Sequence, residues 1–319
     1  MNQTCKKILV TCFDNVGDLV FISSVTANLK QSYPDSEIHV VCKEYTGQLA
    51  KLLPGVTKSF QADPYWDKSP LRPKGSLRHF LKTWWMLRQE KYDVVVVTGA
   101  CWRSAFYSRL AGIPIRVGYD RRKVRWFLNK TVPMFSRDTG VVNELLRLLP
   151  PIGGETKVPH YQLLEPKSPQ VTSPEIPFIA MHPFAGHPRR CASLDFWNKL
   201  GNELKAKGHK VIWVGAQHEL ERFRKSFAYN DDEFIQHYMK EDNLFNVASF
   251  VKNSKLFIGH DSGPLHVAGA LDVKTLGFYL PSEYKRTFPQ GPGTSRWIVE
   301  SSPNDLKLED VLSNVDALT

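Results

Sequence analysis

The octapeptide GHDSGPLH, Gly259–His266, decides the fold of this chain. It lies between two short apolar runs, KLFI before it and VAGAL after it. This order predicts a strand, a tight loop and a helix, with Asp261 or Ser262 as the helix cap and Pro264 in the first turn. The exposed N–H groups of such a helix N-terminus favour a phosphate or diphosphate, although capped turns of this kind also occur without a ligand.

The first half of the chain alternates strands and helices in the same way. Apolar runs predict buried parallel strands at 7–13, 36–42, 92–97 and 116–119. Apolar periodicity predicts helices over 19–31, 45–53, 76–91 and 103–110. This rhythm indicates an α/β fold with a doubly wound parallel sheet, in which ligands bind outside the carboxyl ends of the strands.

Prolines and glycines are concentrated between Pro150 and Pro177, after which the strand–helix rhythm begins again. Strands are predicted at 177–182, 210–214, 256–258 and 273–279. Helices are predicted at 194–207, from 215 onward, at 244–252 and at 306–318. We therefore expect two Rossmann-like domains facing each other across a cleft. The expected boundaries are an N-terminal domain at 1–158, a linker at 159–176, a C-terminal domain at 177–302 and a C-terminal helix at 303–319.

The composition is that of a globular protein without disulfides. The 319 residues suffice for two domains of about 150 residues each, and 42% of them are hydrophobic. Five cysteines are scattered with no C-x-x-C pair, which argues for a reducing compartment and against a zinc site. The sequence shows no signal peptide and no apolar run of membrane-spanning length. We expect a cytoplasmic protein with no bound metal or cofactor.

The positive charge of the chain suggests an anionic partner. Lys and Arg number 42 against 32 Asp and Glu, a formal net charge of +10. Two basic segments that also carry aromatic residues, 72–91 with Arg78 and 121–127 with Arg121, either bind an anionic lipid or are solvated helix faces. No recognised nucleic-acid motif accompanies the charge, so nucleic acid is the weaker alternative.

Several enzyme classes are excluded because their motifs are missing. The chain has no G-x-G-x-x-G, no G-x-x-x-x-G-K-[ST] and no G-x-S-x-G, which argues against dinucleotide-dependent dehydrogenases, P-loop kinases and α/β-hydrolases. Its Asp–Asp doublet, Asp231–Asp232, lies in a polar stretch that we interpret as a solvated loop rather than a metal site.

Polar residues at the predicted strand ends are the candidates for chemistry. Asp18 follows Gly17 at the start of a helix, where it can take a proton from a substrate hydroxyl. The alternative is that Asp14 or Asp18 merely caps the helix.

In the second half, the loop at 182–190 brings Arg189 and Arg190 to a strand end, where guanidinium groups suit a diphosphate or form a solvated basic turn. Glu219 can accept hydrogen bonds from ribose hydroxyls or simply favour a helix N-terminus. His266 fits a packed, hydrogen-bonded helix histidine better than a catalyst.

Taken together, the motifs resemble the ADP-heptose:lipopolysaccharide heptosyltransferases of glycosyltransferase family 9. The matching patterns, in chain order, are D-x-x-G-D at 14–18, R-x-G-Y at 116–119, H-P-x-A-x-x-P-x-R at 182–190, G-A-x-H-E at 215–219 and D-S-G-P-L-H at 261–266. The resemblance spans nearly the whole chain and implies a GT-B fold.

The resemblance also implies roles for individual residues. Asp18 corresponds to the general base that deprotonates the acceptor hydroxyl. The implied donor-binding residues are Arg190, Glu219, Asp261, Ser262, Gly263 and His266. For the acceptor we predict Asp14, Gly17, Arg78 and Arg121.

The implied reaction is inverting and independent of metal. The implied partners are a nucleoside diphosphate sugar, ADP-heptose in the family, and an anionic glycolipid acceptor, with peripheral contact to the inner membrane. The chain departs from the family at 190–193, where R-C-A-S replaces the frequent K-R-W-P. The alternatives are a same-fold transferase acting on a protein or secondary metabolite, a sugar-nucleotide epimerase, and a non-catalytic protein that binds nucleotide sugars or nucleic acid.

Overall fold

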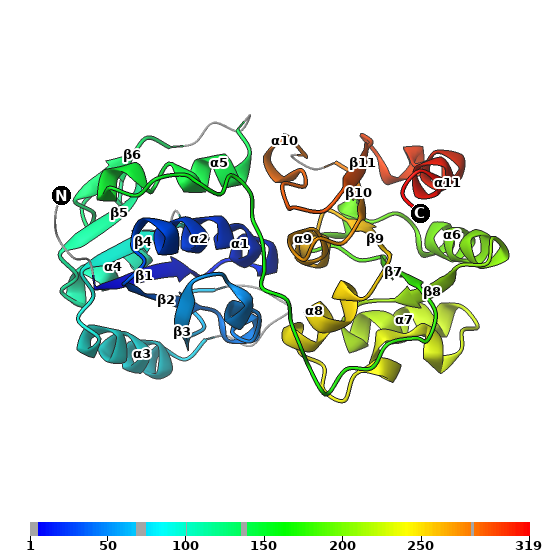
Figure 1. Cartoon of the computed structure of the whole chain (residues 1–319), viewed down its shortest axis with the longest axis horizontal. Coiled ribbons are helices and arrows are strands. Elements are labelled where there is room, and N and C mark those ends of the chain that lie inside the picture. Colours follow the sequence, from blue (N-terminus) through cyan, green and yellow to red (C-terminus); the bar gives the residue numbers. More distant parts are fainter. Residues whose placement is uncertain (1–5, 68–74, 100, 135–138, 282–283) are drawn as a thin grey trace. The chain divides into compact units, whose positions relative to one another are not determined.

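The computed structural model describes residues 6–67, 75–99, 101–134, 139–281 and 284–319. The chain divides into two compact units, Met1–Tyr161 and Gln162–Thr319, which we call the N-terminal and C-terminal units (Figure 1). Each unit is built on a parallel β-sheet with helices against its faces. This confirms the predicted α/β, doubly wound architecture of both halves.

The sheet of the N-terminal unit has the strand order β3-β2-β1-β4-β5-β6, and all its strands are parallel. Its strands are β1 (Lys7–Cys12), β2 (Glu37–Cys42), β3 (Val56–Gln61), β4 (Val94–Val97), β5 (Ile115–Tyr119) and β6 (Lys130–Val132). This is the strand order of dinucleotide-binding folds, and the order reverses between β1 and β4. The crevice for a ligand is expected at that point, beyond the carboxyl ends of the two strands.

Helices cover both faces of this sheet. The helices described are α1 (Val16–Phe21), α2 (Ser23–Ser32), α3 (Leu77–Gln89), α4 (Trp102–Leu110) and α5 (Val141–Leu146). On one face, α3 and α4 pack on the sheet through Phe80, Trp84 and Tyr107. The Tyr107 ring lies 5.1 Å from that of Phe80 and 5.7 Å from that of Trp84, centroid to centroid. These aromatic contacts bury one side of α3 and leave its opposite side to solvent.

The sequence-based elements of this unit need three corrections. The helix predicted at 19–31 begins earlier, at Val16, and is interrupted at Ile22. Near this break, the hydroxyls of Ser23 and Ser24 donate to backbone carbonyls of the preceding turn, which competes with regular helix bonding. The helix predicted at 45–53 is two short 3-10 turns, Glu44–Thr46 and Leu49–Leu52.

The third correction concerns elements that the apolar pattern did not reveal. Strands β3 and β6 are sheet edges with exposed residues, so they lack the continuous apolar run of a buried parallel strand. Helix α5 was also not predicted. Residues 72–74 of the predicted basic segment and Ala100 of the turn after β4 lie outside the described residues.

The sheet of the C-terminal unit is parallel as well, in the order β11-β10-β9-β7-β8. Its strands are β7 (Phe178–His182), β8 (Lys210–Trp213), β9 (Leu256–His260), β10 (Thr275–Tyr279) and β11 (Ser295–Val299). Counted from β7, this is the 2-1-3-4-5 order of flavodoxin-like sheets, and the order reverses between β7 and β9. Strand β11, at a sheet edge, was not predicted.

The helices of this unit lie close to their predicted positions, except for the short α10, which was not predicted. Those described are α6 (Leu194–Ala206), α7 (Gln217–Ser226), α8 (Leu244–Lys252), α9 (Gly263–Ala270), α10 (Tyr284–Thr287) and α11 (Leu308–Asp316). Helix α11 lies beside α6 (Figure 1), where Lys207 and Asp316 form an ion pair of 2.7 Å. No helix among the described residues is long and apolar enough to cross a membrane.

The proline-rich stretch forms backbone hydrogen bonds on both sides of the division between the units. The Asn28 side chain accepts from the backbone N–H groups of Lys157 and Val158, at 2.6 and 2.9 Å. After the division at Tyr161, the N–H of Leu163 donates to the carbonyl of Ala270 at 2.9 Å. These bonds hold the backbone on each side of the division, so this stretch is packed rather than a free tether.

The carboxylate of Glu90 joins three elements of the N-terminal unit and gives a test of their stability. It binds Lys7 of β1 at 2.8 Å and Lys58 of β3 at 2.5 Å, and these two bonds lower the pKa of Glu90 to about 2. Since the native pKa lies below the unfolded value, the stabilisation is present above pH 4.5 and is lost as the pH falls toward 2. We expect Glu90→Gln to lower the free energy of unfolding by about 1–2 kcal/mol at pH 7.

Urea unfolding of both proteins between pH 7 and pH 3 measures this difference, which should shrink as the pH falls. The control is Glu155→Gln, because Glu155 is 73% exposed and lies 3.5 Å from Lys157 in an exposed pair. An equal loss of stability at pH 7 and pH 3 would contradict the assigned role of Glu90.

Candidate functional site

The N-terminal unit places Asp14, Gly17 and Asp18 at its switch point, just beyond the carboxyl end of β1. Asn15 is the N-cap of α1, and Asp18 lies in the first turn of that helix. The Oδ2 atom of Asp18 accepts from the backbone N–H of Asn15 at 3.0 Å. The structure therefore shows the capping contact, which orients the half-buried carboxylate at the helix start and leaves a carboxylate at the position of the predicted base.

Asp14 is more exposed and lies beside Gly99, which follows β4. A Cβ atom on Gly99 would lie 3.0 Å from Oδ2 of Asp14, so the two switch-point loops touch. Protein atoms surround the Asp14 carboxyl although its surface is exposed; this desolvation, and next the negative charge of Asp18, raise the pKa of Asp14 to about 6. The nearby ammonium of Lys43 acts in the opposite direction. A carboxyl group that titrates near neutral pH beside a second carboxylate is a common feature of sites that handle protons.

Lys43 is a member of this cluster that the sequence reasoning missed. It directly follows β2, is buried, and binds Asp67 at 2.5 Å. Its position after a predicted strand was the signal that could have identified it. Arg78 on α3 and Arg121 after β5 are exposed, and neither has a hydrogen bond or ion pair to Asp14 or Asp18. The structure does not bring these two predicted acceptor residues into the cluster.

The C-terminal unit brings two predicted donor loops together at its own switch point. One loop follows β7 and contains the 3-10 turn Pro188–Arg190, and the other follows β9 and leads into α9. Nη1 of Arg190 lies 3.8 Å from Oδ2 of Asp261 across these loops. Pro264 occupies the first turn of α9, as predicted.

The carboxylate of Asp261 corrects one expectation. We expected it to cap the N–H groups of α9 or to reach a donor hydroxyl; among the described residues it makes no capping bond, and its described hydrogen-bond partners are side chains. The His266 ring binds Oδ1 through Nε2 at 3.2 Å, and the Thr287 hydroxyl donates to Oδ2 at 3.1 Å. Thr287 belongs to no motif, so no sequence signal pointed to it. His266 is thus a buried, hydrogen-bonded helix residue, as its sequence context predicted.

Helix α9 consequently begins without a side-chain cap among the described residues. Ser262 is the N-cap residue, yet its buried Oγ has no hydrogen-bond partner in the described part of the chain. Gly263 follows it as the first residue of the helix. The uncapped N–H groups and the guanidinium of Arg190 lie at the same switch point, and both favour an anion.

Glu219 lies in the first turn of α7, beyond the end of β8. Its Oε2 accepts from the backbone N–H of Ala216 at 3.0 Å, so it stabilises the helix start. Its charge also acts on His182, the last residue of β7. That ring is buried, pairs with the carbonyl of Val214 at 2.8 Å, and has a pKa lowered by burial. The structure shows the capping role for Glu219 and leaves its second carboxylate oxygen for other partners.

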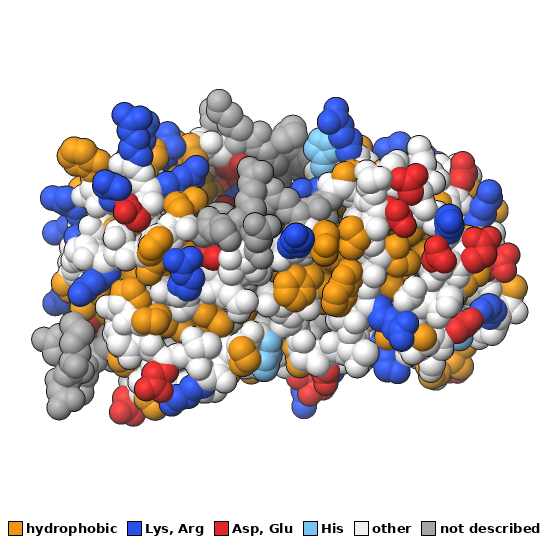
Figure 2. Space-filling model, turned by 90° about the horizontal axis from the view of Figure 1, so that it is seen from above, with side chains coloured by type: hydrophobic (Ala, Val, Ile, Leu, Met, Phe, Trp, Pro, Cys, Tyr) orange, Lys and Arg blue, Asp and Glu red, His pale blue; other side chains and the backbone are white. Residues whose placement is uncertain are grey.

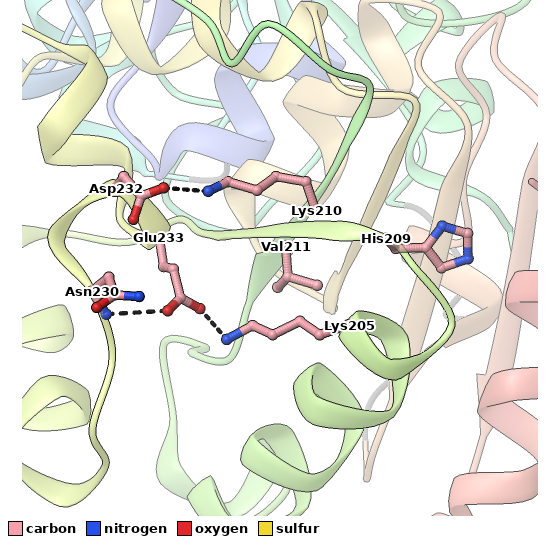
Figure 3. A pocket seen from close by; sticks show the side chains of 7 residues that line it. All are labelled: Lys205, His209, Lys210, Val211, Asn230, Asp232 and Glu233. Carbon is pink, nitrogen blue, oxygen red and sulfur yellow. Dashed lines mark hydrogen bonds and ion pairs between the residues drawn. The ribbon is translucent and has the colours of Figure 1, made fainter.

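A pocket of about 150 Å³ lies elsewhere in the C-terminal unit, where β8 begins rather than where it ends (Figure 3). It is lined by Lys205, His209, Lys210, Val211, Asn230, Asp232 and Glu233. Lys210 pairs with Asp232 and Lys205 with Glu233 (Figure 3), so each ammonium is neutralised by its own carboxylate. These pairs connect α6, β8 and the following turn, and the pocket is a structural ion-pair cluster rather than the candidate site. Among the described residues, no cluster of His, Cys, Asp and Glu could hold a metal ion.

Comparisons with known proteins show the family of this chain. The model of glycosyltransferase family 9 (heptosyltransferase) matches residues 80–311. Lipopolysaccharide heptosyltransferase 2 of Escherichia coli is 24% identical over 308 residues, covering 89% of this chain and 85% of its own. The solved glycosyl transferase family 9 of Veillonella parvula superimposes with a TM-score of 0.80 at 15% identity, covering 98% and 97% of the two chains.

A third relative was solved with a nucleotide. The E. coli heptosyltransferase WaaC with ADP superimposes with a TM-score of 0.78 at 16% identity, covering 98% of this chain and 100% of its own. The shared fold confirms the predicted GT-B class, and the family match covers most of the chain. The protein therefore belongs to glycosyltransferase family 9 and is a heptosyltransferase-like glycosyltransferase.

Proposed function

We propose that this enzyme transfers a heptose from a nucleoside diphosphate heptose to an anionic glycolipid of the lipopolysaccharide core, with inversion at the anomeric carbon. The observation that carries the proposal is the meeting of Arg190, Asp261 and the uncapped start of α9 at the switch point of the C-terminal sheet. A diphosphate is the ligand whose charge and size suit a guanidinium beside a helix N-terminus.

On the donor side, Arg190 and the N–H groups of α9 neutralise the diphosphate. As the bond from the anomeric carbon to the phosphate oxygen breaks, its electron pair leaves with the nucleoside diphosphate. The preorganised positive charge stabilises this leaving group without a divalent cation. ADP is the first nucleotide to test, because WaaC, which shares this fold, was solved with ADP.

On the acceptor side, Asp18 is the general base. Its carboxylate takes the proton of the acceptor hydroxyl as that oxygen forms the new bond to the anomeric carbon from the face opposite the diphosphate. The hydrogen bond from Asn15 orients Asp18, and Asp14 lies close enough to contact the same acceptor. This assignment gives the two neighbouring carboxyl groups separate roles, one in chemistry and one in binding.

Substitution of Asp18 tests the assignment of the base. Asp18→Asn keeps an oxygen that can accept from Asn15 but cannot take a proton, so we expect kcat to fall by about 10²–10⁴-fold. The affinity for ADP, measured by calorimetry, should stay unchanged because Asp18 does not bind the donor diphosphate. Transfer is measured with ADP-heptose and a purified heptose-deficient core glycolipid.

Asp35→Asn is the matched control, since Asp35 is an exposed aspartate of the same unit. Retained transfer in Asp18→Asn would remove Asp18 as the base. Donor turnover without any acceptor, unaffected by Asp18→Asn, would instead indicate an epimerase.

Arg190 and its neighbour Arg189 provide a matched pair for the donor site. Arg190 faces Asp261, whereas the exposed side chain of Arg189 has no ion pair among the described residues. We expect Arg190→Met to weaken ADP binding by about 10–100-fold and Arg189→Met to leave it near the native value. Calorimetry in the presence of EDTA makes the comparison, and equal losses in the two variants would contradict the assignment of Arg190.

The net positive charge of the chain lies in the N-terminal unit, and this supports our proposal of an acceptor bound to a membrane. Residues 1–161 contain 24 Lys and Arg and 13 Asp and Glu, a net charge of 24 − 13 = +11. Residues 162–319 contain 18 and 19, a net charge of 18 − 19 = −1. On the face seen in Figure 2, Lys and Arg side chains lie among hydrophobic ones over the N-terminal unit, at the left. Basic residues of this kind are attracted to anionic lipid surfaces.

Exposed apolar side chains accompany this charge on the outer side of α3 and α4. Trp85 is 63% exposed, Leu110 is 53% exposed and Trp126 is 74% exposed. Arginines connect the segments that carry them: Arg88 donates to the Leu110 carbonyl at 2.6 Å, and Arg109 donates to the Trp126 carbonyl at 3.1 Å. Tryptophan flanked by arginine suits the interface of a bilayer, so this surface is the proposed contact with an anionic membrane.

Vesicle flotation tests this contact. We expect the protein to float with phosphatidylcholine vesicles that contain phosphatidylglycerol, to float less at high salt, and not to bind phosphatidylcholine alone. Trp85→Ser/Trp126→Ser should reduce flotation, whereas Leu164→Ser/Ile176→Ser, two exposed apolar residues of the C-terminal unit, should not. Equal flotation of the two double variants would exclude this surface as the contact.

A further inference from the structure

His260, the last residue of β9, lies directly behind the proposed donor site. It is fully buried, and it precedes Asp261 in the chain. Its ring stands edge-to-face against Trp197 of α6, with centroids 5.2 Å apart, and against Phe278 of β10 at 5.8 Å. It lies within the octapeptide 259–266, but no role was predicted for it, because the predicted strand ended at 258 and the observed strand continues to His260.

One ring nitrogen of His260 accepts two hydrogen bonds, one from the loop that carries Arg190 and one from α6, which follows that loop. Nε2 accepts from the backbone N–H of Ala192 at 3.2 Å and from the indole Nε1–H of Trp197 at 3.1 Å. Because both partners only donate, Nε2 must be unprotonated and the proton of the neutral ring sits on Nδ1. Burial lowers the pKa of His260 to about 3, so the ring stays neutral at physiological pH.

The two donors bracket the segment that leads from Arg190 into α6. Ala192 lies two residues after Arg190, which ends the 3-10 turn Pro188–Arg190. Trp197 lies in the beginning of α6 and is fully buried. The Nε2 atom of His260 therefore fixes the end of the Arg190 loop to β9. The other loop of the switch point, which begins at Asp261, starts from the same strand.

Burying a histidine at this position carries a free-energy cost. Nδ1 of His260 has no hydrogen-bond partner among the described residues, so burying the imidazole carries a cost that an apolar residue would avoid. What the imidazole supplies, and an apolar ring cannot, is an acceptor aimed at the Arg190 loop. Phenylalanine would fill the same space but leave two buried N–H groups without an acceptor.

We propose that His260 is a positioning residue that holds the Arg190 loop against Asp261 and the start of α9. It touches no ligand and acts only through the placement of Arg190. The inference rests on the proposed function for the identity of the ligand, but the placement of the loop does not depend on it.

The test combines ligand binding with a measurement on the free protein. In His260→Phe we expect the amides of residues 187–192 to exchange with deuterium faster, while those of β9 and β10 keep their protection. ADP binding, measured by calorimetry, should weaken by about tenfold, the loss typical of one well-placed hydrogen bond. In the background of Arg190→Met, His260→Phe should cause no further loss, because the residue that it positions is absent.

Two variants separate positioning from general damage. His39→Phe removes another buried histidine, which binds the Tyr92 hydroxyl at 2.9 Å in the N-terminal unit, and should leave ADP binding unchanged. His260→Gln restores an acceptor and should recover part of both signals, and it carries the same comparisons should His260→Phe fail to fold.

Each outcome decides between the inference and its alternatives. Unchanged exchange at 187–192, or equal losses of ADP affinity with and without Arg190, would overturn the positioning role. A native protein that binds none of ADP, GDP and UDP would overturn the proposed function. In that case the exchange data still decide whether His260 holds the loop.

Discussion

Parallel pairing of β7 with β9, with no strand between them, is the constraint on which the candidate donor site depends. Every strand of the C-terminal sheet points the same way, so all the loops that follow the strands emerge at one edge. At the reversal of strand order the loops after β7 and β9 leave the sheet side by side and their helices pack on opposite faces. Arg190 and the start of α9 meet there, although more than 70 residues separate them in the sequence.

Within this crevice, electrostatics explain why an acidic residue can stand in a site for an anion. The Asp261 side chain is only 8% exposed, and its two carboxylate oxygens are bound by His266 and Thr287, so both oxygens already have partners within the protein. Its charge attracts the guanidinium of Arg190 at 3.8 Å, a distance that leaves the arginine donors available to a further acceptor. In the proposed function the carboxylate aligns this cation for the diphosphate, and His260 accepts a hydrogen bond from Ala192 behind the same loop.

The two units handle charge in different ways. The C-terminal unit is nearly neutral overall, and at its switch point a helix start and Arg190 supply positive charge. The N-terminal unit carries the whole net charge of the chain, and its helix α3 exposes Arg78, Lys82 and Arg88 along with Trp85. Yet its switch point is acidic, with Asp14 and Asp18 side by side. Under the proposed function, acidic groups at the switch point of a basic unit fit a proton-accepting site for an anionic substrate.

The sequence by itself determined the α/β class, the buried strands and most helix positions. Continuous apolar runs and helical periodicity are local properties of the chain, and the strands and helices that they predict are present in the structure. The same locality explains the misses: β3, β6 and β11 are edge strands without a full apolar run, and hydroxyl contacts in the preceding turn accompany the break between α1 and α2. For the candidate site, the motifs predicted Asp18, Arg190 and the loop at 261–263. Only the tertiary structure decided that Asp261 binds His266 and Thr287 instead of capping α9, that Lys43 joins the acidic cluster, and that His260 reaches Ala192. These contacts depend on strand order and on side-chain directions across elements distant in sequence, which no local pattern records.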